Sequence, residues 1–373
     1  MISYLLNRWV YIVVALLFTG ASVLEYFFAK KKKLMIVVLI VLLFIFFLLG
    51  ILKGQSVGLD THKYTETYIY VGSLNDPLTF ITQKFPEVIF YSFMALFACV
   101  FKSPEILFWI LEYGTICIFL FFSFIKLDRP IFKLSIFMFM GFFMMSLSGI
   151  RQSISIAIGT YAIIYFIRNI KETSVKKYII YYILTVLAAG IHESSIILAV
   201  LPLLFLIKFN KKTFIIWVPL FLFLPSILSR IFSFVSSNIN VYYFPYDYNV
   251  SITFILTIIL LFFVFIVVRD EDFFTKIFKK FNYAQPEFDA KLNSYIWIVY
   301  FSLVFLCTNV FSLVVPRYSM FLYIGTVEII AMLLGGIKNN YIRLALTILT
   351  VSFFGVYFVV RASTLGIVPY VFM

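Results

Sequence analysis

Long apolar stretches follow one another along almost the whole chain, and short clusters of polar and charged residues separate them. A helix of about 20 apolar residues matches the hydrocarbon thickness of a bilayer. The pattern therefore predicts an all-α polytopic membrane protein with about 12 transmembrane helices in a single integral membrane domain, residues 1–373. The expected spans are 9–29, 34–52, 104–125, 131–149, 152–168, 178–191, 194–208, 213–230, 251–268, 292–310, 319–337 and 344–361.

Clusters of Lys and Arg between the apolar stretches predict the orientation of the chain. Cytoplasmic loops collect these residues, so we expect both termini outside. The first apolar stretch ends in four lysines, Lys30 to Lys33, which predicts a membrane anchor rather than a cleaved signal peptide. The other basic segments expected in the cytoplasm are 126–133, 168–177, 208–212, 269–280 (within a cytoplasmic loop 269–291) and 338–343.

Residues 86–101 are apolar but short for a span. If they crossed the bilayer, every later basic loop would move to the outer face. We therefore expect an interfacial or re-entrant helix at the outer face, within a long outer loop at 53–103. A second outer loop is expected at 231–250, and a short outer turn at 311–319.

Composition excludes several classes of protein. With 63% hydrophobic and 13% charged residues, the chain carries more apolar surface than a soluble fold could bury. The net charge of +13 is explained by basic cytoplasmic loops, so no nucleic-acid partner is expected. The three cysteines have no CxxC spacing, two histidines are too few for a usual metal cluster, and no phosphate-binding glycine loop is present. We expect no cofactor and no metal.

Polar residues interrupt the apolar sequence at "SLSGIRQSISIAIGT" (146–160). Arg151 stands at the outer end of a predicted span, so its side chain either snorkels to the interface or faces the bundle interior and marks a substrate path. Snorkelling needs no polar stripe, and the stripe here favours the second interpretation. The residues with helical spacing that form this stripe are Ser148, Arg151, Gln152, Ser155 and Gly159.

Two further segments place ionisable residues at the predicted outer face. In "LAAGIHESSI" (187–196), His192 and Glu193 lie at the turn between two short helices; they are either a base or phosphate site facing a cavity, or a solvated hairpin tip. In "VVPRYSMFLYIG" (314–325), Arg317 begins a late span. Arg151 and Arg317 either bind one anionic ligand, since guanidinium groups bind phosphate bidentately, or coincide by chance.

A fourth segment, "GLDTHKYTETYIY" (58–70), follows the second span. Asp60, Lys63 and Tyr64 have helical spacing here. A carboxylate held at the membrane surface could activate a hydroxyl group, and a tyrosine could stack on a sugar; the alternative is an ordinary solvated loop. Asp60 and Glu66 also leave a metal site open. All four segments reach the same predicted face of the membrane.

These segments resemble the EpsG-like members of the Wzy polysaccharide polymerases, over most of the chain. The family usually carries an "EP" pair before the interfacial segment, whereas this chain has "PE" at Pro86 and Glu87. The matching elements are Asp60 with Tyr64, "GIRQSISIAI" (149–158), "AAGIHESSI" (188–196) with His192 and Ser194, and "VPRYS" (315–319).

The resemblance implies a GT-C-like fold and a glycosyltransferase in the bacterial cytoplasmic (inner) membrane, with its active site facing the periplasm or outside. Such a polymerase transfers a glycan from undecaprenyl diphosphate to the terminal sugar of another lipid-linked unit. Its expected partners are the lipid-linked donor and acceptor, the lipid bilayer and a chain-length regulator protein. The implied roles are diphosphate binding for Arg151, Arg317 and Gln152; general base for His192, Asp60 or Glu193; and substrate contact for Tyr64, Lys63, Ser194 and Tyr318.

Other functions remain as alternatives. An O-antigen ligase or another lipid-linked-sugar glycosyltransferase would use the same chemistry. A flippase for lipid-linked oligosaccharides should line its core with charge through the depth of the membrane, whereas the polar residues here gather at one face, apart from Glu25, Glu112 and Glu328. A membrane acyltransferase would need a cytoplasmic catalytic set, which the cytoplasmic loops lack.

Overall fold

A computed structural model describes residues 7–54, 56–85, 87–101, 106–209, 290–307, 315–362 and 367–371. These residues form helices and no strand, which confirms the all-α prediction and supports a polytopic membrane protein. The predicted spans 213–230 and 251–268, the outer loop 231–250 and nearly all of loop 269–291 lie outside the described residues. The total of about 12 spans and the GT-C-like fold therefore stay predictions.

Six of the described helices are long and apolar enough to cross a membrane. Each coincides with a span predicted from the apolar pattern, with ends that differ by a few residues. They are Trp9–Phe28, Lys32–Ile51, Pro130–Ser148, Ile150–Arg168, Tyr318–Gly335 and Asn340–Arg361.

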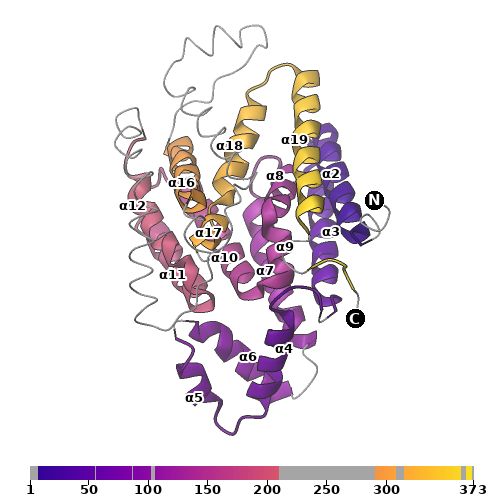
Figure 1. Ribbon diagram of the computed structural model, residues 1–373. Coiled ribbons are helices and arrows are strands. Elements are labelled where there is room, and N and C mark those ends of the chain that lie inside the picture. Colours follow the sequence, from indigo (N-terminus) through magenta and orange to yellow (C-terminus); the bar gives the residue numbers. More distant parts are fainter. Residues whose placement is uncertain are drawn as a thin grey trace. The chain divides into compact units, whose positions relative to one another are not determined.

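The chain divides into two compact units, each built from segments that are distant in sequence. The first unit comprises Met1–Phe166, Ser174–Ile196 and Leu344–Met373, and the second comprises Ile167–Thr173 and Ile197–Arg343. The helices of the first unit (Figure 1) are α2 (Trp9–Phe28), α3 (Lys32–Ile51), α4 (Thr61–Gly72), α5 (Pro77–Thr82), α6 (Val88–Phe101), α7 (Ile106–Phe124), α8 (Pro130–Phe137), a π-helical turn (Met138–Phe142), α9 (Phe143–Ser148), most of α10 (Ile150–Arg168), α11 (Lys176–Ile191) and most of α19 (Asn340–Arg361).

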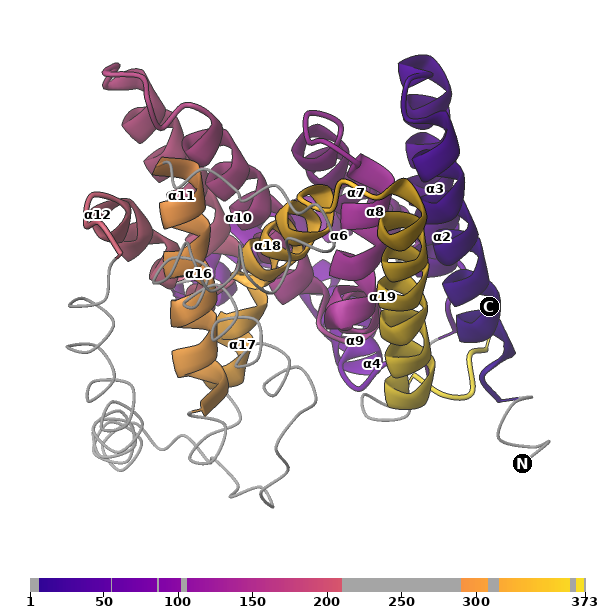
Figure 2. The same ribbon diagram turned by 90° about the horizontal axis from the view of Figure 1, so that it is seen from above.

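Within the first unit, α2, α8 and α19 lie side by side (Figures 1 and 2). Glu25 of α2 is buried in this contact, and its carboxylate accepts hydrogen bonds from the backbone N–H groups of Ile131 and Phe132 at 2.9 and 2.8 Å. The first N–H groups of a helix have no partner inside the helix. Glu25 thus caps α8, which explains one acidic residue within an apolar span.

The span Pro130–Ser148 is not a regular helix. A π-helical turn at Met138–Phe142 interrupts it, with Gly141 at φ +133°, a backbone conformation that favours glycine. The helix ends at Ser148, and Gly149 has non-helical angles. A new helix, α10, begins at Ile150, so Arg151 lies in its first turn.

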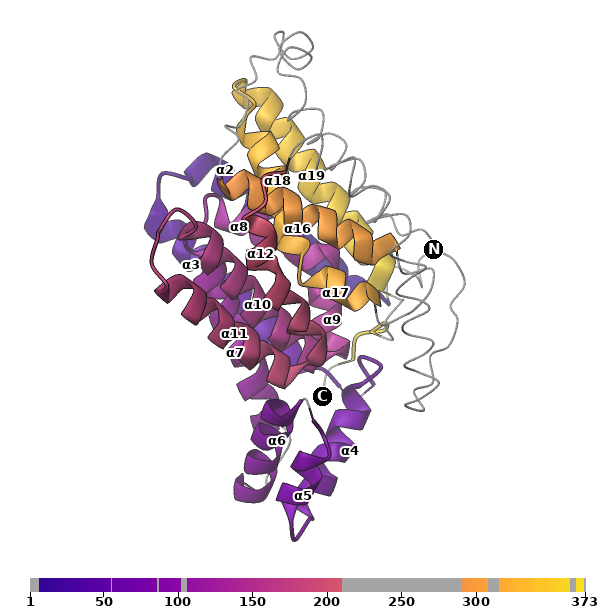
Figure 3. The ribbon, with the colours of Figure 1, turned by 90° about the vertical axis from the view of Figure 1, so that its left-hand side faces the viewer.

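The short helices α4, α5 and α6 gather at one end of the first unit (Figures 1 and 3). The loop before α4 passes close to the end of α9: Gly58 has φ +94°, and a side chain there would collide with the carbonyl oxygen of Leu147. The backbone N–H of Leu59 donates to Ser148 Oγ at 3.0 Å. These contacts fix α4 beside the start of α10. Helix α6, the segment predicted to be interfacial, packs on α4, α5 and α11.

Apolar side chains also cover outward faces of the spans. Leu16 of α2 and Leu349 of α19 are 67% and 65% exposed. Such surface is costly in water but is the ordinary lipid-facing surface of a membrane helix.

The second unit contains α12 (Leu201–Phe205), α16 (Ala290–Cys307), α17 (Val315–Met320) and α18 (Tyr323–Gly335), of which α16, α17 and α18 are seen from above in Figure 2. Two side chains of α16 hold the end of α12. Asn293 Oδ1 accepts from the backbone N–H of Phe209 at 2.6 Å, and Trp297 Nε1 donates to the carbonyl oxygen of Ile207 at 2.7 Å. A 3₁₀ helix, Glu193–Val200, connects α11 to α12.

Candidate functional site

The guanidinium group of Arg151 is held on several sides near the start of α10. Its Nε donates to the hydroxyl oxygen of Tyr64 at 3.1 Å, and its Nη1 donates to the hydroxyl oxygen of Tyr91 at 2.9 Å. Nη1 also forms an ion pair with the carboxylate of Glu87. The side chain is 23% exposed. Arg151 is therefore anchored inside the first unit and does not extend freely to an interface.

Aromatic rings surround the same guanidinium group. Its central carbon lies 5.4 Å from the ring centres of Tyr64 and Tyr91 and 5.7 Å from that of Phe90. Rings at such distances attract a cation through their π-electrons. Burial raises the pKa of Tyr64 to about 12 although Arg151 opposes this change, so its hydroxyl stays protonated.

The carboxylate of Glu87 joins Arg151 to His192. Oε2 pairs with Arg151, and Oε1 lies 2.5 Å from Nδ1 of His192. The backbone N–H of Glu193 also favours the charged form of this carboxylate. Burial alone would raise the pKa of Glu87, but the hydrogen bond with His192 and the charge of Arg151 outweigh it. The pKa of Glu87 is therefore below its ordinary value, and the group is ionised at neutral pH.

His192 ends helix α11. Its backbone is extended (φ −151°, ψ 122°), and its N–H donates to the carbonyl oxygen of Ala188 at 2.9 Å. That same carbonyl accepts from Ser155 Oγ of α10 at 2.9 Å, which ties α11 to the helix that carries Arg151. The imidazole ring of His192 is hydrogen-bonded at Nδ1, and Nε2 has no hydrogen-bond partner among the described residues.

A buried lysine lies behind this cluster. Lys53 is 3% exposed; its Nζ donates to Thr61 Oγ1 at 3.0 Å and to the carbonyl oxygen of Leu147 at 2.6 Å. It also lies 4.8 Å from the ring centre of Trp109, whose ring faces Tyr64. Burial lowers the pKa of Lys53 to about 7, and the nearby carboxylates of Glu112 and Asp60 only partly oppose this shift.

Glu112 of α7 is buried as deeply as Lys53, at 3% exposure. Neither of its carboxylate oxygens has a hydrogen-bond partner among the described residues. Lys53 and Arg151 are the cations close enough to act on it electrostatically. Two deeply buried ionisable side chains, Lys53 and Glu112, therefore interact electrostatically close to the cluster.

The structure brings together three of the residues predicted for the site, Arg151, His192 and Tyr64. Asp60 is the N-cap of α4, one turn before Tyr64, and its charge acts on Lys53. Gln152 and Ser194 are buried next to the cluster in sequence, at 4% and 2% exposure. In contrast, the side chains of Glu193 and Lys63 are exposed.

Arg317 and Tyr318 belong to α17 in the second unit. The side chain of Arg317 lies outside the described part of the chain, and Tyr318 is half-buried. A shared ligand for Arg151 and Arg317 therefore stays a prediction.

Sequence reasoning missed Glu87, the residue at the centre of the cluster. It lies 64 residues from Arg151 and 105 from His192, so no local spacing connects the three. One signal was present: an arginine within an apolar chain needs an anionic partner, and Glu87 directly precedes the apolar segment predicted to lie at the membrane surface. Tyr91, one helical turn later, was missed for the same reason.

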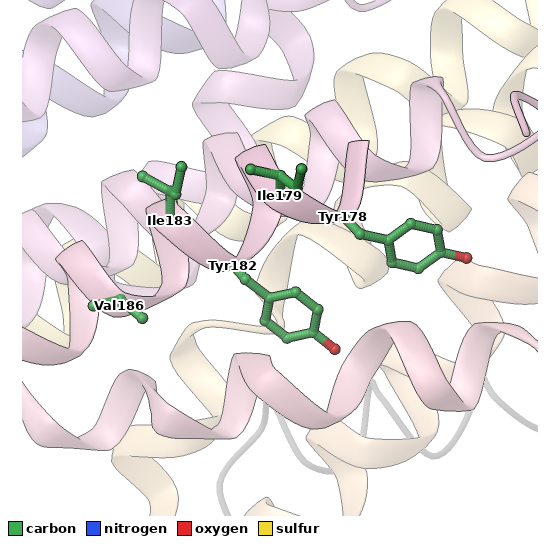
Figure 4. A pocket seen from close by; sticks show the side chains of 5 residues that line it. All are labelled: Tyr178, Ile179, Tyr182, Ile183 and Val186. Carbon is green, nitrogen blue, oxygen red and sulfur yellow. The ribbon is translucent and has the colours of Figure 1, made fainter. Parts of the chain in front are cut away.

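A shallow apolar groove runs along α11, the helix that His192 ends (Figure 4). None of the predicted site residues lines it. Its lining consists of Tyr178, Ile179, Tyr182, Ile183 and Val186, with the two tyrosine rings on one side in Figure 4.

Comparison with known protein families finds one match. A family model described as the EpsG family matches residues 35–372, nearly the whole chain. No curated protein and no solved structure matches the chain. The matched range includes every residue of the cluster and confirms the resemblance inferred from the short motifs.

Proposed function

The chain belongs to the EpsG family of Wzy-like polymerases, and we propose that it polymerises the repeat units of a bacterial surface polysaccharide. The donor is a glycan on undecaprenyl diphosphate, the acceptor is the terminal sugar of another lipid-linked unit, and the reaction takes place at the outer face of the cytoplasmic membrane. The observation that carries the proposal is the half-buried cluster of Arg151, Glu87 and His192 with Tyr64.

The chemistry of the cluster suits this transfer. The bond between the donor's anomeric carbon and the diphosphate breaks, and the diphosphate leaves with the electron pair. Arg151, with Arg317 as its predicted partner, stabilises the charge that develops on this leaving group. The acceptor hydroxyl oxygen forms the new glycosidic bond, and its proton passes to Nε2 of His192.

The aromatic and hydroxyl groups around Arg151 complete the proposed site. Tyr64, in contact with Arg151, offers a ring face for a sugar next to the diphosphate. Asp60, at the start of the same helix, is the second candidate for the base. The short apolar helix α6 provides a surface along which the lipid chain approaches.

Deletion of the gene in its source bacterium tests the function. A polymerase mutant should still attach single repeat units to the final carrier but make no long chains. Loss of every unit from the outer face would instead indicate a flippase, and long chains held on the lipid carrier would indicate a ligase. Return of long chains with the wild-type gene, but not with Arg151→Ala, would connect the activity to the cluster.

A further inference from the structure

One carboxylate, that of Glu87, contacts both groups to which the proposed reaction assigns a task. Each of its oxygens has a different partner: Oε1 lies on Nδ1 of His192, and Oε2 pairs with Nη1 of Arg151. The Glu87 side chain is 14% exposed, and those of its partners are 11% and 23% exposed. All three are largely shielded from water, and each keeps a small exposed fraction.

The contact at Nδ1 decides what the other side of the imidazole ring can do. Which ring nitrogen of a histidine carries the proton is set by the hydrogen bond that the other nitrogen makes. An ionised carboxylate on Nδ1 requires a proton there, because it can only accept. Nε2 of His192 then carries the free electron pair, as a general base must.

The contact with Arg151 has a different consequence. Tyr64 and Tyr91 already use Nε and Nη1 of the guanidinium, and Glu87 neutralises its charge. Among the described residues Nη2 has no hydrogen-bond partner, so it remains for a ligand. A diphosphate, with at least two negative charges, would compete with Glu87 for the guanidinium.

We propose that Glu87 is a positioning residue that couples substrate binding to base catalysis. It holds His192 with Nε2 directed to the acceptor, and it occupies Arg151 until the diphosphate of the donor displaces it. This role rests on the proposed polymerase function.

The carboxylate keeps its place after that displacement, because its Oε1 still lies against Nδ1 of His192. When Nε2 takes the acceptor's proton, the resulting imidazolium lies against an ionised carboxylate that Arg151 no longer neutralises. Donor binding therefore increases the stabilisation that Glu87 gives to the protonated base.

The test uses Glu87→Gln in the full chain, purified in lipid nanodiscs. Binding is measured with undecaprenyl diphosphate, and turnover with lipid-linked repeat units isolated from the deletion strain. The amide keeps the size of the side chain but not its charge. We expect turnover to fall about 100-fold, while undecaprenyl diphosphate binds as tightly as before or more tightly. Glu87→Asp keeps the negative charge. Its turnover should be at least about tenfold faster than that of Glu87→Gln.

Asp128→Asn is the matched control. It removes an exposed carboxylate in the loop between α7 and α8, to which no role in the reaction is assigned. We expect neither binding nor turnover to change.

Three outcomes would contradict the inference. A Glu87→Gln protein as fast as wild type would exclude a positioning role. Equal loss of binding and turnover in both the Gln and Asp variants, with the protein still folded, would show that Glu87 only supports the structure. If the wild-type protein does not lengthen the isolated units, the proposed function itself is wrong, and the role of Glu87 falls with it.

Discussion

At the scale of single residues, the central question is why an arginine interrupts the apolar sequence. Arg151 is anchored by an ion pair, two phenolic hydroxyls and three aromatic rings, all within one unit. A snorkelling arginine would need none of these partners. The contacts favour the interpretation in which the guanidinium faces the interior of the helix bundle rather than the membrane interface.

The geometry of these contacts predicts the result of Arg151→Lys. Nε and Nη1 reach Tyr64 and Tyr91 at the same time because the guanidinium is a rigid plane. A single ammonium group cannot reproduce that arrangement or bind a phosphate bidentately. We expect the variant to keep its charge and its place in the membrane but to lose about 100-fold in polymer synthesis.

Chain length, compared by gel electrophoresis, measures this loss. The control is Arg168→Lys at the opposite end of α10, where the side chain is exposed, and it should leave chain length unchanged. Normal long chains in the Arg151→Lys strain would contradict a bidentate role.

At the scale of elements, the apolar pattern predicts helices well because hydropathy is a local property of the chain. The helix break near Gly149 was predicted to within about two residues, and with it the position of Arg151 at a helix start. The short helix within 86–101 was also predicted. The π-helical turn in Met138–Phe142 and the burial of Lys53 were not, because both depend on packing between distant segments.

The connection between α3 and α4 predicts how stability changes with pH. The ordinary pKa of a lysine is 10.5, whereas burial lowers that of Lys53 to about 7. At a pH between these two pKa values, Lys53 binds a proton in the unfolded chain that it lacks in the folded chain. The free energy of unfolding should therefore rise with pH in this window, with a slope of about one proton.

Thermal unfolding in detergent between about pH 7 and pH 9 measures this slope. Lys53→Met should remove it, and Lys176→Met, at an exposed lysine, should retain it. The Met variant also removes one of the two cations that act on the buried Glu112, so Lys53→Met with Glu112→Leu should be more stable than Lys53→Met alone. An unchanged slope in Lys53→Met would show that Lys53 is not the titrating group.

At the scale of the whole molecule, the basic clusters and the candidate site are expected on opposite sides of the membrane. Arg151 and Arg168 lie at the two ends of the candidate span α10. The loop after Arg168 is rich in Lys and Arg, which predicts the cytoplasm. The end with Arg151, where Glu87 and His192 meet it, is then expected at the outer face, the side on which the proposed reaction uses a lipid-linked donor.

Two cysteine variants test this orientation in a background without the native cysteines. Glu193 and Thr173 are both exposed, the first beside His192 and the second in the basic loop. A maleimide that cannot cross membranes should label Glu193→Cys in intact cells and Thr173→Cys only after the membrane is opened. The reverse pattern would place the cluster on the cytoplasmic side. A nucleotide-activated donor would then be available to it, and a reaction between two lipid-linked units at the outer face would be excluded.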